Sequence, residues 1–91
     1  MDQEKLQCIL EKHKLWLQTR HLRHIKGCRA DLRNTNLTGT NLTGIDLRYA
    51  NLMCADLRYA NLTNADLGYT NLTNADLRYA NLTGADFRYA N

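Results

Sequence analysis

The chain has 91 residues, no proline and a formal net charge of +3. This length suits one small domain, and the longest apolar runs are far too short to cross a membrane. Its three cysteines, an odd number with no signal peptide ahead of them, favour a reducing cytoplasm over a disulfide framework.

Residues 1–29 differ in pattern from the rest and are expected to form a separate element. Their apolar residues recur at helical spacing, which predicts an amphipathic helix from about Gln3 to Gln18 with His13 on the same stripe. The stripe consists of Leu6, Ile9, Leu10, Trp16 and Leu17. Such a stripe must be covered by another part of the fold.

The same segment holds the positive charge, with seven basic and three acidic residues. Its interleaved histidines and tryptophan leave contact with nucleic acid or an anionic membrane as an alternative to a simple solvated face. His21, His24 and Cys28 could supply metal ligands, but their spacing matches no standard zinc finger, so no metal is expected.

From residue 30 to residue 91 the chain repeats every five residues. A small residue or Ile45 stands two places before each central residue, and Asp or Asn stands directly before it, so the unit is A-(D/N)-L-x-x. The central residues are the predicted core: Leu32, Leu37, Leu42, Leu47, Leu52, Leu57, Leu62, Leu67, Leu72, Leu77, Leu82 and Phe87.

A five-residue period fits neither an α-helix nor an open strand, and it indicates a solenoid. Each unit can point its alanine and leucine inward and turn the chain at a corner. Two inward residues per unit bury too little alone, so successive coils must stack.

These repeats resemble the pentapeptide repeat proteins, a family of bacterial and often cyanobacterial proteins. The resemblance implies an all-β solenoid, a right-handed quadrilateral parallel β-helix with one pentapeptide per side and residues twenty apart stacked. The present chain would form about three coils with an N-terminal α-helical cap that seals the first coil. Leu22 and Gly27 keep the five-residue phase, so a degenerate half-turn is expected between helix and coils.

Opposite sides of the expected coil share a sequence. Two sides read mostly D-L-R-Y, and the other two read N-L-T followed by Asn or Gly. Asn and Gly can supply the positive φ of a type II turn, whereas tyrosine resists it. We therefore expect a different, irregular turn at the tyrosine corners.

Stacked coils would align the tyrosines in columns beside arginines that can lie over the rings. Stacking alone can explain such columns, yet a flat Tyr/Arg surface also has the composition of a protein interface. The candidate surface consists of Arg48, Tyr49, Arg58, Tyr59, Tyr69, Arg78, Tyr79, Arg88 and Tyr89.

No catalytic site is expected, because the chain has no serine and the repeats have no histidine. The sequence therefore predicts a non-enzymatic protein interaction or scaffold module with an unknown partner and no cofactor. Its final coil, exposed at the end of the sequence, could pair end to end with a second copy or be continued by another repeat chain.

Three further alternatives are a DNA mimic, an ice-binding surface and a calcium site. Family members that protect DNA gyrase imitate DNA with an acidic rod, but here five arginines oppose six aspartates over residues 30–91. A threonine column at positions 43, 63 and 83 raises the possibility of ice binding, although it lacks a second rank. Stacked Asp46, Asp66 and Asp86 suggest calcium less than a charge ladder with neighbouring arginines.

Overall fold

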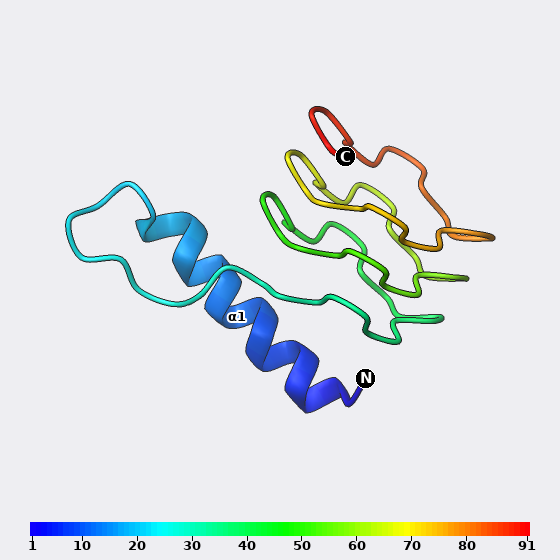
Figure 1. Cartoon of the computed structure of the whole chain (residues 1–91), viewed down its shortest axis with the longest axis horizontal. Helices are drawn as coiled ribbons and strands as arrows, with labels where there is room; N and C mark the ends of the chain where they lie inside the picture. Colours follow the sequence, from blue (N-terminus) through cyan, green and yellow to red (C-terminus); the bar gives the residue numbers. More distant parts are fainter.

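The computed structural model describes all 91 residues and has one regular element, the helix α1 (Gln3–Thr19), beside a stack of coils (Figure 1). Asp2 caps the helix by accepting a hydrogen bond from the Glu4 N–H at 2.9 Å. α1 ends one residue beyond the expected position. No helix is long and apolar enough to span a membrane.

Residues 20–29 turn back and run beside α1, as the cyan loop in Figure 1 shows. The Cys28 N–H donates to the Lys12 carbonyl at 3.2 Å, and Gly27 lies so close to the helix that a Cβ would collide with the same carbonyl. The expected half-turn is therefore wrong: Leu22 is 49% exposed, and coil pairing begins only at Asp31. This segment packs against α1 through Gly27, so it does not form a side of a coil although Leu22 and Gly27 keep the five-residue spacing.

Coils stack with a period of twenty residues. Eight isolated parallel bridges join residues twenty apart, from Asp31 with Asn51 to Asp66 with Asp86. Each level therefore carries four bridge positions, one for each pentapeptide. A side is too short for a continuous strand, because each bridge is followed at once by a corner, so the β-structure consists of single bridges.

In the second coil, residues 50–69, every backbone N–H has a partner. The leucine N–H and the second corner N–H donate to the following coil, as Leu57 does to Asp76 at 2.8 Å. The Asp/Asn N–H donates to the preceding coil, and the N–H of the small residue closes the turn onto the leucine carbonyl. The remaining N–H, on the first corner residue, donates to the Oδ1 of the Asp or Asn two residues before it, as Arg58 does to Asp56 at 3.1 Å. This Asx bond explains why the repeat requires Asp or Asn.

The core fills the inside of the coils. The eight leucines from Leu32 to Leu67 are 0–2% exposed, and the neighbouring alanines Ala50, Ala55, Ala60 and Ala65 are equally buried. In the last coil Leu72, Leu77 and Phe87 are only partly buried, and Leu82 is 36% exposed.

All twelve corners adopt one conformation, contrary to the expectation for tyrosine. The second corner residue has positive φ at every corner, including Tyr49 (67°), Tyr59 (61°) and Tyr69 (57°). At eleven corners the N–H of the following residue donates to the carbonyl of the central Leu or Phe, as from Ala60 to Leu57 at 3.1 Å, which identifies type II turns. At the first corner the Thr35 hydroxyl donates to the Leu32 carbonyl instead, at 2.6 Å. At Tyr49, Tyr59 and Tyr69 the N–H binds the following coil, which favours this left-handed conformation. Ring stacking favours it at all five tyrosines, including Tyr79 and Tyr89 of the last coil.

α1 covers the first coil. Leu6 is 3% exposed, and Ile9 and Leu10 pack against the leucine core. Trp16 and Leu17 are half-buried. His13 is fully buried, and its Nδ1 accepts a hydrogen bond from the Ala30 N–H at 2.9 Å, which places the imidazole proton on Nε2. The histidine thus ties the helix to the residue at which the repeats begin.

Truncation of the central leucine Leu57 to alanine should cost about 2–5 kcal/mol of unfolding free energy, because it leaves a cavity in the middle coil. Arg58→Ala at the adjacent corner should cost well under half as much, because the side chain is exposed and solvent screens its ion pair with Asp56. Urea unfolding followed by circular dichroism measures both. Equal losses would show that inside and outside are reversed.

Replacement of Tyr69 tests the corner conformation. Tyr69→Ala and Tyr69→Gly both remove the ring, but only glycine relieves the left-handed backbone, so the glycine variant should be more stable by about 1 kcal/mol. Thermal unfolding of the two variants makes the comparison. An alanine variant at least as stable as the glycine variant would contradict the type II turn.

His13 should make the cap pH-sensitive. Burial lowers the pKa of His13 below its usual value of about 6.5, so the unfolded chain binds a proton more readily than the folded chain. Stability should therefore be full above about pH 6.5 and fall as the pH drops below it, because protonation of Nδ1 also breaks the bond from Ala30. Melting temperatures between about pH 8 and 5 measure this. His13→Gln should flatten the profile, whereas the exposed His21→Gln should leave it unchanged.

Candidate interaction surface

The tyrosines form two columns at opposite corners of the coil. The long column contains Tyr49, Tyr69 and Tyr89, with neighbouring ring centroids 4.9 Å apart. The short column contains Tyr59 and Tyr79, with centroids 5.0 Å apart. Because the columns lie ten residues, or half a coil, apart, they form two separate surfaces rather than one flat surface.

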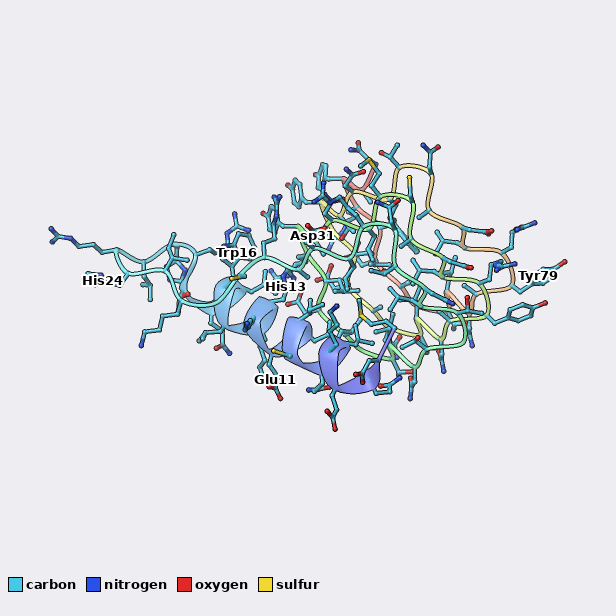
Figure 2. The ribbon with its side chains drawn as sticks, turned by 60° about the horizontal axis from the view of Figure 1, so that its bottom comes forward. Glu11, His13, Trp16, His24, Asp31 and Tyr79 are labelled. Atoms are coloured by element: carbon cyan, nitrogen blue, oxygen red, sulfur yellow. The ribbon has the colours of Figure 1, made fainter.

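These rings are held in place yet open to solvent. The exposed fractions are 61% for Tyr59, 52% for Tyr69 and 76% for both Tyr79 and Tyr89. Tyr49 is half-buried because the cap continues its column: Trp16 meets its ring edge-on at 6.2 Å. Figure 2 shows Trp16 on the cap helix and Tyr79 on the opposite side of the molecule.

The corner arginines bind carboxylates, not rings. Arg48, Arg58, Arg78 and Arg88 each hold the aspartate two residues before them through Nε and Nη2, at distances of 2.7–3.1 Å. Arg33 does the same with Asp31. The expectation that these arginines lie over the tyrosines is therefore wrong. The planar fork of guanidinium matches a carboxylate held in reach by the corner itself.

A different arginine lies over the rings. The guanidinium carbon of Arg20, just after α1, lies 3.8 Å from the Tyr49 ring centroid and 5.1 Å from that of Trp16. Sequence reasoning missed this contact, because residues 20 and 49 belong to segments with no common pattern. The amphipathic stripe indicates that Trp16 faces the coils, and this was the one sequence signal that pointed to the position of the contact.

The arginine forks neutralise most of the carboxylates. Side-chain hydrogen bonds from Arg58 hold the pKa of Asp56 well below its usual range, and Arg33, Arg78 and Arg88 lower the pKa of their own aspartates in the same way. Arg48 also reaches Asp66 of the next coil, with Nε 3.6 Å from Oδ2. The repeats therefore present paired charges, not the acidic rod needed to imitate DNA.

The other candidate sites do not assemble. No group of three or more His, Cys, Asp or Glu side chains is arranged to hold a metal ion. The hydroxyls of Thr43, Thr63 and Thr83 donate to their own asparagines at 2.6–2.7 Å, so this column does not present free hydroxyls for ice. Cys8, Cys28 and Cys54 are free and exposed.

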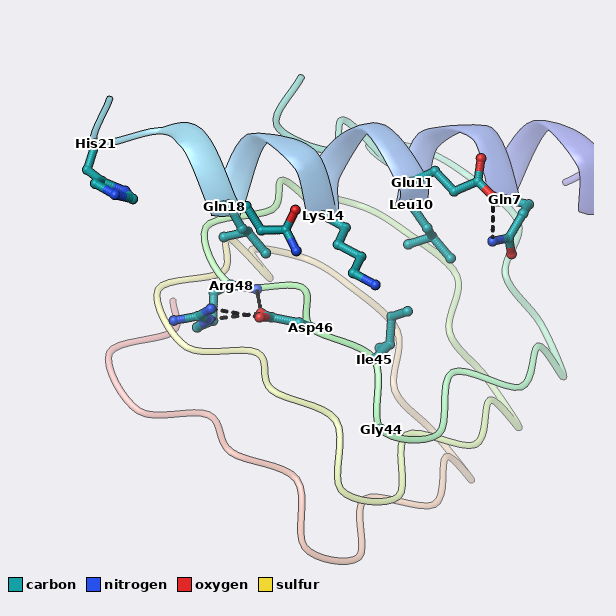
Figure 3. Close-up of a pocket in the computed structure, with 11 residues that line it drawn as sticks. Gln7, Leu10, Glu11, Lys14, Gln18, His21, Gly44, Ile45, Asp46 and Arg48 are labelled. Atoms are coloured by element: carbon teal, nitrogen blue, oxygen red, sulfur yellow. Dashed lines mark hydrogen bonds and ion pairs between the residues drawn. The ribbon is translucent and has the colours of Figure 1, made fainter. Parts of the chain in front are cut away.

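A groove of about 770 Å³ lies between α1 and the first coil (Figure 3). Its apolar floor comes from Leu10, Leu17 and Ile45, and the Asp46–Arg48 pair closes one side. Its polar rim comes from Gln7, Glu11, Lys14, Gln18, His21 and Gly44. The rim offers Glu11, Lys14 and His21 as possible bases, but no serine, threonine or cysteine lines the groove for them to activate.

The comparisons agree with the repeat pattern. The family described as Pentapeptide repeats matches residues 29–58 and 55–91, in 8 copies. No protein of curated function matches the chain.

Solved structures similar to the chain come from cyanobacteria. A pentapeptide repeat protein (Rfr23) from Cyanothece 51142 is 35% identical with a TM-score of 0.66, and the match covers 68% of this chain and 43% of that chain. HetL from Nostoc sp. strain PCC 7120, a pentapeptide repeat protein involved in heterocyst differentiation regulation, is 32% identical with a TM-score of 0.36, and the match covers 68% and 42%. Alr5209 from Nostoc PCC 7120 is 38% identical with a TM-score of 0.31, and the match covers 64% and 56%. The chain thus spans less than two thirds of the length of these relatives.

Proposed function

Because the chain belongs to the pentapeptide repeat family, we propose that it is a non-enzymatic binding module that holds a protein partner on its tyrosine columns. Members of the family generally serve as structural modules without enzymatic activity. We include in the proposal the right-handed winding of the family's β-helix, which rests on membership of the family. The twenty-residue bridge register supports four pentapeptides per coil.

The observation that carries this proposal is the pre-ordered exposure of the rings. The short column leaves Tyr59 and Tyr79 61% and 76% exposed while their stacking fixes both side chains. Rings already held in one position lose little conformational entropy when a partner covers them. Tyrosine and arginine are also enriched at protein interfaces, and Arg58 and Arg78 flank the column.

The charge distribution favours a protein partner over nucleic acid. On the coils each arginine is committed to an aspartate, so little positive charge is free to meet phosphates. The excess charge lies in residues 1–29, and Arg20 is occupied by the rings of Trp16 and Tyr49. Nucleic-acid contact through this segment, or regulation of a nucleic-acid enzyme, is the runner-up. We place the module in the reducing bacterial cytoplasm, a location that its three free, exposed cysteines support.

The function can be tested by capture from a cyanobacterial lysate with the immobilised chain. Tyr59→Asn with Tyr79→Asn removes the short column but keeps residues that tolerate positive φ, as Asn64 and Asn74 do at other corners. We expect the double variant to lose a captured protein that the wild type retains, while Thr63→Ala on another side retains it. Capture unaffected by loss of both columns, or inhibition of gyrase supercoiling by the chain, would overturn the proposal.

We further propose that the last coil is covered by a second copy stacked end to end or by another repeat chain. The N–H groups of Leu72 and Leu77 have no backbone partner, whereas those of Leu52 and Leu57 below them donate to the last coil. The exposed Leu82 and the partly buried Phe87 lie at the same edge. An unpaired edge of this kind favours association.

Sedimentation over a range of concentrations tests the second copy. The wild type should self-associate reversibly, because one coil offers only a small contact. Phe87→Lys should shift the chain toward monomer, because it places a charge in the contact. A wild type that stays monomeric at high concentration would exclude the second copy as the cover.

A further inference from the structure

Asp66 is the exception among the six aspartates of the coils. The other five each receive an arginine fork from the residue two places on, but that place is Gly68 after Asp66. Asp66 keeps the Asx bond, since the Gly68 N–H donates to its Oδ1 at 3.0 Å. Its nearest cation is the Nε of Arg48 at 3.6 Å, and the fork of that arginine is already bound to Asp46. The carboxylate of Asp66 therefore lacks the bidentate partner that its counterparts have.

The backbone does not require glycine at this position. Gly68 is absent from the residues with positive φ, unlike Gly39, Gly44 and Gly84. A Cβ built on it would lie 3.3 Å from Asp66 Oδ1, 3.5 Å from the Arg88 carbonyl and 3.8 Å from Arg48 Cγ. Only the first of these contacts is tight, and the equivalent corners accommodate a whole arginine. The glycine thus leaves open the space that an arginine side chain fills elsewhere.

This open space is a notch of about 290 Å³ in the long column. Arg48 and Arg88 lie one coil to either side, and Tyr69 and Tyr89 form its aromatic border. Arg48 is paired with Asp46 and Arg88 with Asp86, so the three aspartates of this corner have two arginines and a net charge of −1 remains. The excess lies at Asp66, which shares Arg48 at the longer distance of 3.6 Å. A guanidinium group can lie next to another one coil away when each binds its own aspartate, as Arg58 and Arg78 do at the opposite corner.

We propose that the notch binds the guanidinium of an arginine side chain from a protein partner, with the two guest nitrogens bridging the carboxylate of Asp66. The guest would restore at this corner the fork that the chain supplies at the other five. A planar guanidinium suits the notch better than the ammonium of lysine, because it binds a carboxylate bidentately and can stack on tyrosine. The proposal rests on the proposed function, since it names the partner's chemistry at the long column.

Binding can be measured by NMR titration of the full chain with N-acetylarginine amide, with N-acetyllysine amide at equal ionic strength as the comparison. The Asp66 side-chain carboxyl and the Gly68 amide should shift together and saturate with the arginine probe. The lysine probe should bind several-fold more weakly, and the carboxyl of Asp76 should not move. Equal shifts at all aspartates, or equal affinity for both probes, would overturn the proposal.

Two variants provide independent tests. Gly68→Arg supplies the missing fork from within the chain and should abolish the saturable shift at Asp66. Asp66→Asn keeps the Asx bond, as the asparagine corners do, but removes the charge, and should weaken the arginine probe about tenfold. If Gly68→Arg does not fold, Asp66→Asn alone decides. Unchanged affinity in a folded variant would overturn the site.

The titration tests the arginine site and the lysate capture tests the proposed function, so a negative result in one can be told apart from a negative result in the other. Tyr69→Asn with Tyr89→Asn removes the exposed part of the long column and tests the column as a docking surface. A captured protein that is lost in this double variant but retained by Gly68→Arg would support the proposed function and overturn the arginine site. A saturable, arginine-selective shift without any captured protein would support the site and count against the proposed function.

Discussion

The fold depends on one hydrogen bond that is local in the sequence. This Asx bond runs from the first corner N–H to the Asp or Asn side chain two residues before it. In the second coil, turns and neighbouring coils satisfy the other four N–H groups of each repeat, and the first corner N–H is the only one that points to neither. Without this bond each of the twelve corners would leave one N–H unpaired, and each unpaired N–H would reduce the free energy of unfolding of the small rod. The Asx bond also fixes the carboxylate or amide at the surface. This is why the chemistry of the outside follows directly from a backbone requirement.

Much of the fold could be predicted from the sequence because the five-residue period is short and regular. The inward leucines follow from alternation and stacking. The twenty-residue register was implied by the family resemblance, and the family match confirms that resemblance. The corner conformation was mispredicted, because the preference of an isolated tyrosine against positive φ is a local property. In the coils that preference competes with a hydrogen bond to the next coil and with ring stacking, as at Tyr69, and the two together outweigh it.

The candidate site was predictable in composition but not in arrangement. The residue pattern places the tyrosines in two columns, but it does not show whether an arginine turns toward a ring or toward a carboxylate. The geometry of the corner decides this. The aspartate of the same corner lies within hydrogen-bonding distance of the arginine Nε and Nη2, so Arg58 binds Asp56 at 2.7 Å and leaves the Tyr59 ring exposed to solvent. The contact of Arg20 with Tyr49 depends on how the cap lies on the coils, and no periodic pattern contains that information.

The twenty-residue bridge register also restricts how the length of such a chain can change during evolution. Insertion of one pentapeptide keeps the inward pattern but moves every later residue by one side, so that D-L-R-Y corners would stack on N-L-T corners. Insertion of two pentapeptides restores the corner type but transfers each tyrosine to the opposite column. Only a duplication of twenty residues adds a coil and leaves both columns in line. The surface can therefore be extended only by whole coils of twenty residues, although the sequence repeats every five residues.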